Sequence, residues 1–437
     1  MATIGEVSRA APERADAFLI RGGVPLVGAY RISGAKNAVL PLMAAAMLGS
    51  ASLTLRNVPQ ILDVEVLIAL LRQLGAEVEG EAGAQPTLTI AANKVLPAPI
   101  DAGLVSRMRA SILLLGALLT RFGEADLPLP GGDAIGLRSL DFHLAGLRAM
   151  GASLTLDAGL IRASAPRGLR GAEILLPQPS VGATENLLLA GVLANGRTVI
   201  RNAAREPEVA DLGNCLNAMG ASIVGIGTDT LTVDGRRALG AAEHQVMPDR
   251  IELGTIACAA AITDGDIFLE YGRLDMLGAA AHVLQEAGVE LQQTSSGFRV
   301  HRSAKGLTGT DVQTAPFPGF ATDLQAPVMA LLTIADGASM VRESVFEHRF
   351  RHVGELRKMG ANIKVFGSTA LIRGVQQLRG AAVAGSDVQA AGALVIAALG
   401  ADGETRVDGL EHLHRGYDAM AEKLAACGAR INCVTER

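Results

Sequence analysis

The sequence contains no tryptophan and only three tyrosines among its 437 residues. Proteins that bind single-stranded nucleic acid stack the bases on aromatic side chains, and proteins that bind duplexes gather lysine and arginine on one face. The net charge is −5, and the sequence has no basic cluster. We therefore expect no nucleic-acid partner.

Signals for membranes and secretion are also missing. The longest apolar candidate, SILLLGALLT at 111–120, is far shorter than the roughly 18 residues that cross a membrane. Residues 1–19 contain acids and lack the apolar stretch of a secretory signal. The four cysteines have no metal-type spacing. These absences predict a reduced, cytoplasmic protein without membrane contact, metal or cofactor.

One motif recurs six times along the chain, as LRQLGAEV, LRAMGASL, LNAMGASI, LQEAGVEL, LRKMGANI and LAACGARI. The apolar residues before each glycine follow a helical stripe, and the glycine favours the left-handed turn that ends a helix. A short strand pattern follows each copy. Because the copies lie roughly 70 residues apart, the chain is predicted to contain six α/β units. The glycines are Gly75, Gly151, Gly220, Gly288, Gly360 and Gly428.

Six units of this size favour two domains of three units each, because a single core rarely grows beyond about 250–300 residues. We place the first domain at 36–247 and the second at 248–437. Residues 1–35, a tail and a strand, are predicted to belong to the second domain, which otherwise lacks its closing strand. Ligands often bind in a cleft between two such domains.

Charged and small polar residues lie at the predicted starts of several apolar helices. Lys36 and Asn37 begin one, Arg109 begins another, and Ser180, Val181 and Gly182 precede a third. Helix N-termini attract anions, and a basic side chain adds a full charge. Each feature alone has a simpler explanation, such as an exposed lysine at position 36 or an N-cap at Asp323. Together with Arg349 and Arg415, they predict a site for a heavily anionic substrate.

The stretch LPLPGGDAIGLR, residues 127–138, is rich in proline and glycine and is predicted to be a loop. It carries one acid, Asp133, and one base, Arg138. Aspartate in a turn often serves only to bond its own backbone. The alternative is an acid carried on a flexible lid over a substrate, and the composition of the loop leaves both possibilities open.

Nine motifs along the chain resemble, in order, those of the UDP-N-acetylglucosamine 1-carboxyvinyltransferase family of enolpyruvyl transferases. They are SGAKNAVLP, MRASILLLG, LPGGDAIGLRSLDFHLAGL, PSVGATEN, NAAREPEVADL, MPDRIELGT, PGFATDLQA, FEHRF and HRGYDAM. The resemblance runs from about residue 18 to 431. It implies an inside-out α/β barrel pair, in which six βαβαββ units form two domains.

The resemblance also implies an activity and its residues. Enolpyruvate would pass from phosphoenolpyruvate to the 3-hydroxyl of UDP-N-acetylglucosamine with release of phosphate, the first committed step of peptidoglycan precursor synthesis. Asp133 would be the proton donor and Asp323 the base, with Asn37 also facing the sugar. Lys36, Arg138 and Arg415 would hold the phosphate, and Arg349 the carboxylate. Binding of the nucleotide would fall to Arg109, Ser139, Leu140, Asp141, Phe142, Ser180, Val181 and Gly182.

The sequence departs from the family pattern at three positions. Asp133 stands where most members have a cysteine, the residue that fosfomycin alkylates, although some members carry aspartate. Gln389, in GSDVQAAGALV, replaces an arginine expected near the phosphoenolpyruvate carboxylate. Ser139 stands where a proline often follows the lid arginine. The charge lost at position 389 predicts about a tenfold cost, because a charged hydrogen bond contributes about 1.5–3 kcal/mol and a neutral one about 1.

Two other functions remain open beside cell-wall enolpyruvyl transfer. One is a paralogue that uses another nucleotide acceptor, and the other is a non-catalytic homologue that senses UDP-N-acetylglucosamine. The preserved nucleotide motifs disfavour the paralogue. A sensor has no use for an acid–base set, so Lys36, Asp323 and Arg415 disfavour the sensor.

Overall fold

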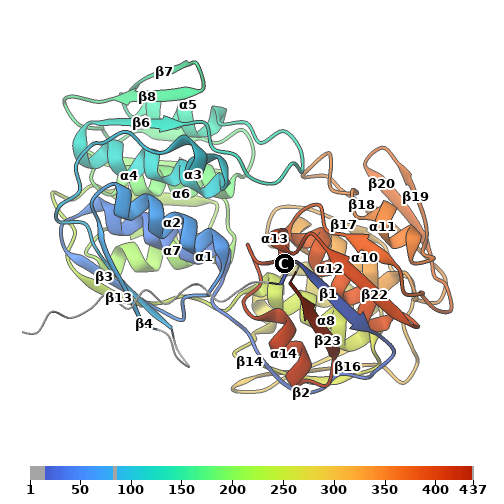
Figure 1. Ribbon diagram of the computed structural model, residues 1–437. Helices are drawn as coiled ribbons and strands as arrows, with labels where there is room; N and C mark the ends of the chain where they lie inside the picture. The colour runs from blue at the N-terminus through green and yellow to red at the C-terminus, as the bar shows by residue number, and fades with distance from the viewer. Residues whose placement is uncertain (1–14, 82–85, 436–437) are drawn as a thin grey trace, which may run out of the picture.

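The computed structural model describes residues 15–81 and 86–435, which form two lobes (Figure 1). The predicted tail, 1–14, lies outside the described residues. One buried hydrophobic cluster lies within residues 35–247, here called the first lobe. The other lies within 18–32 and 251–429, here called the second lobe. Among the described residues, no helix combines the length and apolarity needed to cross a bilayer.

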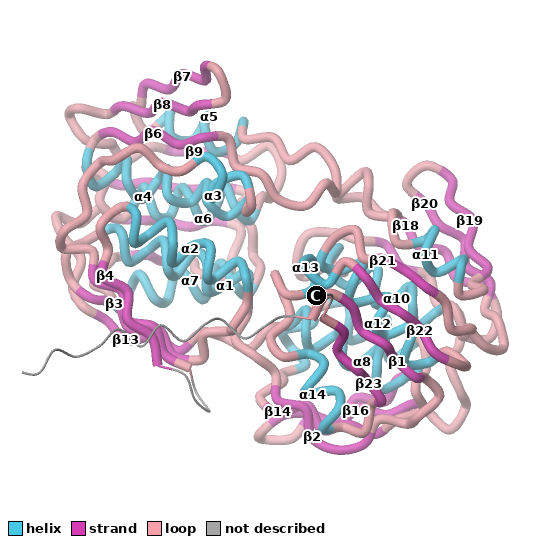
Figure 2. The backbone as a smooth tube through the Cα atoms, viewed as in Figure 1, coloured by secondary structure: helices cyan, strands magenta, loops and turns pink. Residues whose placement is uncertain are grey.

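Each lobe has helices at its centre and sheets around them (Figure 2). The central helices are apolar on nearly all faces, which is the pattern of a helix buried on every side. In α12, for example, every residue is buried. This arrangement confirms the inside-out α/β architecture. The central helices are α1 (Lys36–Ala45), α4 (Leu113–Phe122) and α6 (Val181–Gly191) in the first lobe, and α8 (Arg250–Ile262), α10 (Gln325–Leu332) and α12 (Val388–Gly400) in the second.

The described residues form six separate sheets, three in each lobe, without strand pairing that would join them into a continuous barrel. In the first lobe the sheet orders are β13-β3-β5-β4, β6-β8-β7 and β9-β10-β12-β11. The strands are β3 (Ser52–Arg56), β4 (Glu77–Glu81), β5 (Thr87–Ala91), β6 (Glu124–Pro128), β7 (Ser153–Asp157), β8 (Leu160–Ser164), β9 (Glu173–Leu175), β10 (Arg197–Arg201), β11 (Ile223–Val224), β12 (Thr230–Asp234) and β13 (Ala242–Gln245). The remaining helices are η1 (Ala46–Leu48), α2 (Leu62–Gln73), α3 (Ala102–Ser106), η2 (Arg109–Ile112), α5 (Asp141–Ala149) and α7 (Pro207–Ala218).

The second lobe repeats the plan, with sheet orders β2-β14-β16-β15, β17-β18-β20-β19 and β21-β22-β1-β23. Its strands are β1 (Ala17–Arg21), β2 (Val27–Arg31), β14 (Asp266–Glu270), β15 (Val289–Gln293), β16 (Gly297–Arg302), β17 (Val312–Gln313), β18 (Ala338–Arg342), β19 (Asn362–Phe366), β20 (Thr369–Arg373), β21 (Ala382–Ala384), β22 (Glu404–Asp408) and β23 (Arg430–Val434). Its remaining helices are η3 (Leu274–Leu277), α9 (Ala279–Glu286), η4 (Thr322–Leu324), α11 (Val353–Lys358), α13 (Leu410–Leu413) and α14 (Met420–Ala426).

The six repeat glycines end the six peripheral helices as the motif predicts. Each has a positive φ between 88° and 100°, for example 95° at Gly75 and 96° at Gly428. A residue with a Cβ is strained in this region, whereas glycine is not. A strand begins within three residues of each glycine, such as β4 after Gly75. The local turn chemistry is therefore confirmed in all six units.

The N-terminal strands complete sheets of the second lobe. In the other units the strand after the glycine pairs with the next strand of the chain, but β23 is the last strand and pairs instead with β1. Figure 1 shows this blue strand between the red strands β22 and β23. At the two points where the chain crosses between the lobes, a strand pairs in one lobe and the helix that follows it belongs to the other. Strand β2 leads into α1 of the first lobe but pairs with β14, and β13 leads into α8 of the second lobe but pairs with β3.

Candidate active site

A cavity of about 490 Å³ lies between the lobes and is lined by residues of both. All six central helices begin at its wall. The lining residues at or just before these starts are Lys36 for α1, Arg109 for η2 and α4, Ser180 for α6, Asp249 for α8, Asp323 for η4 and α10, and Val388 for α12. Helix N-termini carry unpaired amides and a partial positive charge. The fold therefore directs six positive helix ends at one space, which suits an anion.

Most of the predicted site residues line this cavity, although they come from distant parts of the sequence. Leu140 and Asp141 lie beside the cavity but are not among its lining residues. The predicted residues that do line it are Lys36, Asn37, Arg109, Asp133, Arg138, Ser139, Phe142, Ser180, Val181, Gly182, Asp323, Arg349, Gln389 and Arg415.

Lys36 and Arg415 are joined by a carboxylate that the sequence analysis did not single out. Asp63, in the first turn of α2, is almost fully buried and lies 2.7 Å from Nζ of Lys36. Arg415 donates to the same carboxylate from Nε at 2.9 Å and from Nη2 at 3.3 Å. Burial alone would lower the pKa of Arg415, but the bond to Asp63 raises it. Asp63 thus fixes two cations side by side at the cavity wall.

The loop of residues 129–140 joins β6 to α5 and reaches from the first lobe to the second (Figure 1). The amide of Leu137 donates to Glu347 Oε2 at 3.1 Å, and the amide of His348 donates to the carbonyl of Ile135 at 3.0 Å. Gly136 has a φ of 148°, and a Cβ there would collide with Glu347. At the inner end of this loop, Asp133 accepts a hydrogen bond from Arg415.

The second predicted acid, Asp323, does not cap a helix. It lies within η4, whose N-cap is Ala321, and its carboxylate accepts a hydrogen bond from Arg349. Burial alone would raise the pKa of Asp323, but the charges of Arg349, Arg250 and other cations hold it below its usual value. Asp323 is therefore an ionised carboxylate at neutral pH. Nε of Arg349 is buried without an acceptor among the described residues, so this arginine retains a donor for a ligand.

The part of the cavity around α6 is built from helix starts and two close arginines. Ser180 is the N-cap of α6 and accepts a hydrogen bond from the amide of Ala183. Arg109 donates to the carbonyl of Arg138. Burial, together with the charge of Arg138, lowers the pKa of Arg109 to about 10. A bound anion would stabilise the charged form of Arg109 against both burial and the neighbouring Arg138.

Three glutamates, two of which line the cavity, form an acidic group that is largely buried. Glu185 lies in α6, while Glu206 and Glu208 lie at the start of α7. Glu208 accepts a hydrogen bond from Nε of Arg250 at 2.8 Å. Burial, and the charges of Glu208 and Glu206, raise the pKa of Glu185 well above its usual value. Oε1 of Glu185 has no partner among the described residues. This side chain is therefore a neutral acid at the cavity wall.

We expect the charge of Glu185 to control how stability changes with pH. Above the ordinary glutamate pKa of about 4.3, the unfolded chain releases a proton that the folded protein keeps, so stability falls as pH rises. Glu185→Gln keeps the shape and removes this dependence. Between pH 5 and 8, the difference in unfolding free energy between this variant and the unaltered protein should grow in favour of the variant by up to about 1.4 kcal/mol per pH unit. Chemical denaturation at several pH values tests this, with the exposed Glu79→Gln as control, and parallel curves would contradict it.

Gln389 lines the same cavity as Arg349 and lies in the first turn of α12. Its Oε1 accepts a hydrogen bond from the hydroxyl of Tyr417 at 2.9 Å, and that hydroxyl lies 2.9 Å from Oγ1 of Thr255. Its backbone amide donates to Asp387, the N-cap of α12. The glutamine is thus held at the start of a central helix, with a neutral side chain where the family resemblance implies a charge.

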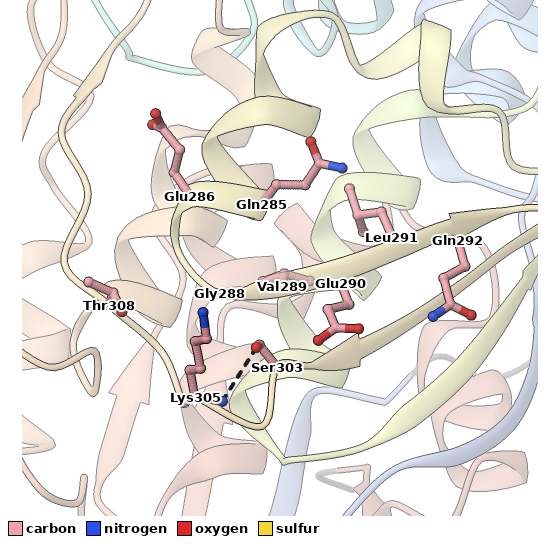
Figure 3. A pocket seen from close by; sticks show the side chains of 11 residues that line it. Gln285, Glu286, Gly288, Val289, Glu290, Leu291, Gln292, Ser303, Lys305 and Thr308 are labelled. Carbon is pink, nitrogen blue, oxygen red and sulfur yellow. Dashed lines mark hydrogen bonds between the residues drawn. The ribbon is translucent and has the colours of Figure 1, made fainter.

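A second hollow, of about 450 Å³, lies at the edge of the second lobe (Figure 3). It is lined by the end of α9, by β15 and by the loop after β16, where Glu286, Glu290 and Lys305 are exposed. It contains none of the predicted site residues and none of the central helix starts. Among the described residues, no group of three or more His, Cys, Asp or Glu side chains is placed to hold a metal ion. The chemistry of the protein therefore belongs to the cavity between the lobes.

Comparisons with known proteins agree with this geometry. The family model of EPSP synthase (3-phosphoshikimate 1-carboxyvinyltransferase) matches residues 20–424. The UDP-N-acetylglucosamine 1-carboxyvinyltransferase of Gluconacetobacter diazotrophicus is 54% identical, over 96% of this chain and 100% of that protein. The protein of the same name from Granulibacter bethesdensis is 52% identical, again over 96% of this chain and 100% of the relative.

Solved structures show the same fold. The enolpyruvyl transferase NikO from Streptomyces tendae superposes with a TM-score of 0.88 at 28% identity, covering 97% of this chain and 100% of that one. EPSP synthase from Acinetobacter baumannii superposes with a TM-score of 0.73 at 19% identity, covering 95% of this chain and 99% of that one, which bears on the fold alone. The chain belongs to the EPSP synthase family and, within it, to the UDP-N-acetylglucosamine 1-carboxyvinyltransferases.

Proposed function

We propose that this protein transfers enolpyruvate from phosphoenolpyruvate to the 3-hydroxyl of UDP-N-acetylglucosamine and releases phosphate. The observation that carries the proposal is one cavity in which six helix starts and six basic side chains surround two separately held carboxylates, Asp133 and Asp323. The basic side chains are Lys36, Arg109, Arg138, Arg250, Arg349 and Arg415. Preorganised charge of this kind is usually the largest contribution to catalysis, and phosphoenolpyruvate carries both a phosphate and a carboxylate for it to bind.

The reaction assigns a different task to each carboxylate. Asp323 takes the proton of the sugar hydroxyl as its oxygen attacks C2 of phosphoenolpyruvate, while Asp133 gives a proton to C3. The resulting intermediate carries both the sugar and the phosphate on C2. Asp133 then takes a proton back from C3, the C2–O bond to phosphate breaks, and the double bond re-forms. Lys36 and Arg415, held by Asp63, stabilise the departing phosphate.

The nucleotide occupies the side of the cavity formed by the first lobe. The amides at the start of α6, together with Arg109 and Arg138, receive the diphosphate, because helix starts and arginines both bind phosphate oxygens. Ser139 and Phe142 border the same region. Leu140 and Asp141 would then act on the nucleotide through the position of the loop. We also propose domain boundaries at residues 36 and 247, and a cytoplasmic location, which fits four free cysteines.

A phosphate-release assay tests this function against both alternatives. Phosphate should appear only when UDP-N-acetylglucosamine and phosphoenolpyruvate are both present, and mass spectrometry should show the enolpyruvyl ether on the sugar. Release with another nucleotide acceptor alone would identify the paralogue. Nucleotide binding without any release would identify the sensor. Lys36→Met supplies the control for phosphate released by a contaminating enzyme.

Gln389→Arg should strengthen the binding of phosphoenolpyruvate. The substitution adds a charge beside the carboxylate position while the hydroxyl of Tyr417 can accept from the new guanidinium and donate to Thr255. We expect the KM for phosphoenolpyruvate to fall about tenfold, the difference between a charged and a neutral hydrogen bond. The KM for the nucleotide sugar should stay the same. Gln389→Met removes the hydrogen-bonding groups of the side chain and should raise the KM for phosphoenolpyruvate; equal values for all three proteins would refute a role for position 389.

A further inference from the structure

The proposed reaction raises the question of how Asp133 obtains its proton. Aspartic acids ordinarily ionise near pH 4, whereas a donor to C3 must hold a proton when the substrate arrives. In the structure, Oδ1 of Asp133 is an acceptor for Arg415. Arg415 cannot supply the proton, because a guanidinium does not release one under these conditions. The source must be another group within reach of the carboxylate.

His412 is placed to be that group. It lies in α13, three residues before Arg415, and its Nδ1 is 3.9 Å from Oδ1 of Asp133. This Nδ1 is buried and has no hydrogen-bond partner among the described residues. A buried ring nitrogen without a partner is uncommon in folded proteins. The 3.9 Å between Nδ1 of His412 and Oδ1 of Asp133 points to a hydrogen bond that forms during the reaction, since catalytic hydrogen bonds are often long before substrates bind.

The side chain of His412 is 30% exposed. Its Nε2 lies 3.8 Å from Oε1 of Glu411, whose side chain is 71% exposed. The imidazole therefore stands between an exposed carboxylate and the acid in the cavity. Asp133 is in turn paired with Arg415, and Arg415 is held with Lys36 by Asp63. Imidazoles take up and release protons near neutral pH, so this position suits a relay.

We propose that His412 loads Asp133 with the proton that the reaction delivers to C3. The step rests on the proposed function. When the phosphate of phosphoenolpyruvate takes Arg415, the freed oxygen of Asp133 accepts the proton from Nδ1 of the imidazolium. The N–H bond breaks, the O–H bond forms, and His412 becomes neutral. In the elimination step Asp133 recovers this proton from C3, and it returns the proton to Nδ1 of His412 when phosphate leaves and Arg415 binds the carboxylate again. A cysteine at position 133 needs no such partner, because a thiol ordinarily keeps its proton up to about pH 8.5.

The pH dependence of turnover tests the relay. Without His412, Asp133 can be loaded only from bulk solvent, so His412→Asn should lower kcat at pH 8 by about 10- to 100-fold and much less at pH 6. The alkaline limb of its kcat profile should move to lower pH by about one unit or more. The dissociation constant for UDP-N-acetylglucosamine, measured by calorimetry, should remain unchanged and shows that the variant is folded. An unchanged pH profile in His412→Asn and in His412→Gln would overturn the proposal.

A second background separates the relay from a packing role. In Asp133→Cys, adding His412→Asn should change kcat by less than about threefold at pH 7, because the thiol carries its own proton. A packing role predicts the same loss in both backgrounds, and that outcome would also overturn the proposal. If the unaltered protein releases no phosphate from the two substrates, the proposed function fails instead. If the unaltered protein turns over both substrates but substitution of His412 leaves turnover unchanged, the proposed function stands and only the relay is contradicted.

Discussion

Asp133→Asn is expected to lower turnover by about 10²–10⁴-fold, the usual contribution of a general acid. The amide keeps the size of the side chain and can still accept the hydrogen bond from Arg415, but it has no proton to give to C3. The affinity for UDP-N-acetylglucosamine should change little, because the proposed nucleotide site lies at α6 and the arginines beside it. Single-turnover kinetics with saturating nucleotide sugar measure the loss.

Asp126→Asn provides the matched control for this substitution. Asp126 lies on the preceding strand β6 with an exposed side chain, so its variant should turn over normally. Near-normal turnover in Asp133→Asn would mean that Asp133 only shapes its glycine-rich loop, the simpler explanation that the sequence left open. The same position should decide sensitivity to fosfomycin. A thiolate opens an epoxide far more readily than a carboxylate does, so only Asp133→Cys should gain a covalent mass on residues 130–138.

Features set by local chemistry could be predicted from the sequence. The six glycine-ended helices are encoded within eight-residue motifs, and left-handed backbone conformation is a local requirement at Gly75 and its counterparts. The start of α1 at Lys36 follows from a polar pair before an apolar run. The cavity residues within familiar motifs, such as Arg109 and Ser180, were found in the same way. In each case the signal lies within about ten residues of the feature.

Features set by distant contacts could not be predicted in this way. Asp63 looks like an ordinary acid in the first turn of a helix, and its partner Arg415 is 352 positions away. The predicted domain boundaries place β2 in the second domain and β13 in the first, but no local pattern records that these strands pair with β14 and β3. Asp323 was open to interpretation as an N-cap, but its carboxylate instead meets Arg349. Glu185 and Glu206 lay within quoted motifs, yet only their burial marks them as unusual acids.

Asp323→Asn is expected to reduce turnover by about 10²–10⁴-fold through loss of the base. The pKa of Asp323 is lowered chiefly by Arg349, which opposes burial, and a strongly lowered pKa makes a weak base. On the proposed function, phosphoenolpyruvate would resolve this conflict, because its carboxylate would compete with Asp323 for the same guanidinium. As Arg349 turns to the substrate, Asp323 loses its strongest stabilising charge and becomes more basic. Phosphoenolpyruvate would therefore strengthen the base that activates the sugar oxygen for attack on it.

This coupling predicts a particular pH profile for the free enzyme. Because its pKa is lowered, Asp323 stays ionised well below its usual range, so its protonation should contribute no slope to kcat/KM between pH 5 and 8. Any acid limb in that window should survive in Asp323→Asn and belong to another group, such as Asp249, whose pKa burial raises to about 6. Arg349→Gln should remove the cation and move the titration of Asp323 upward into the measured range. Asp402→Asn, at an exposed position of the second lobe, controls for the change of charge. An acid limb that disappears in Asp323→Asn but lies at the same pH in the original protein and in Arg349→Gln would show that Arg349 does not govern the base.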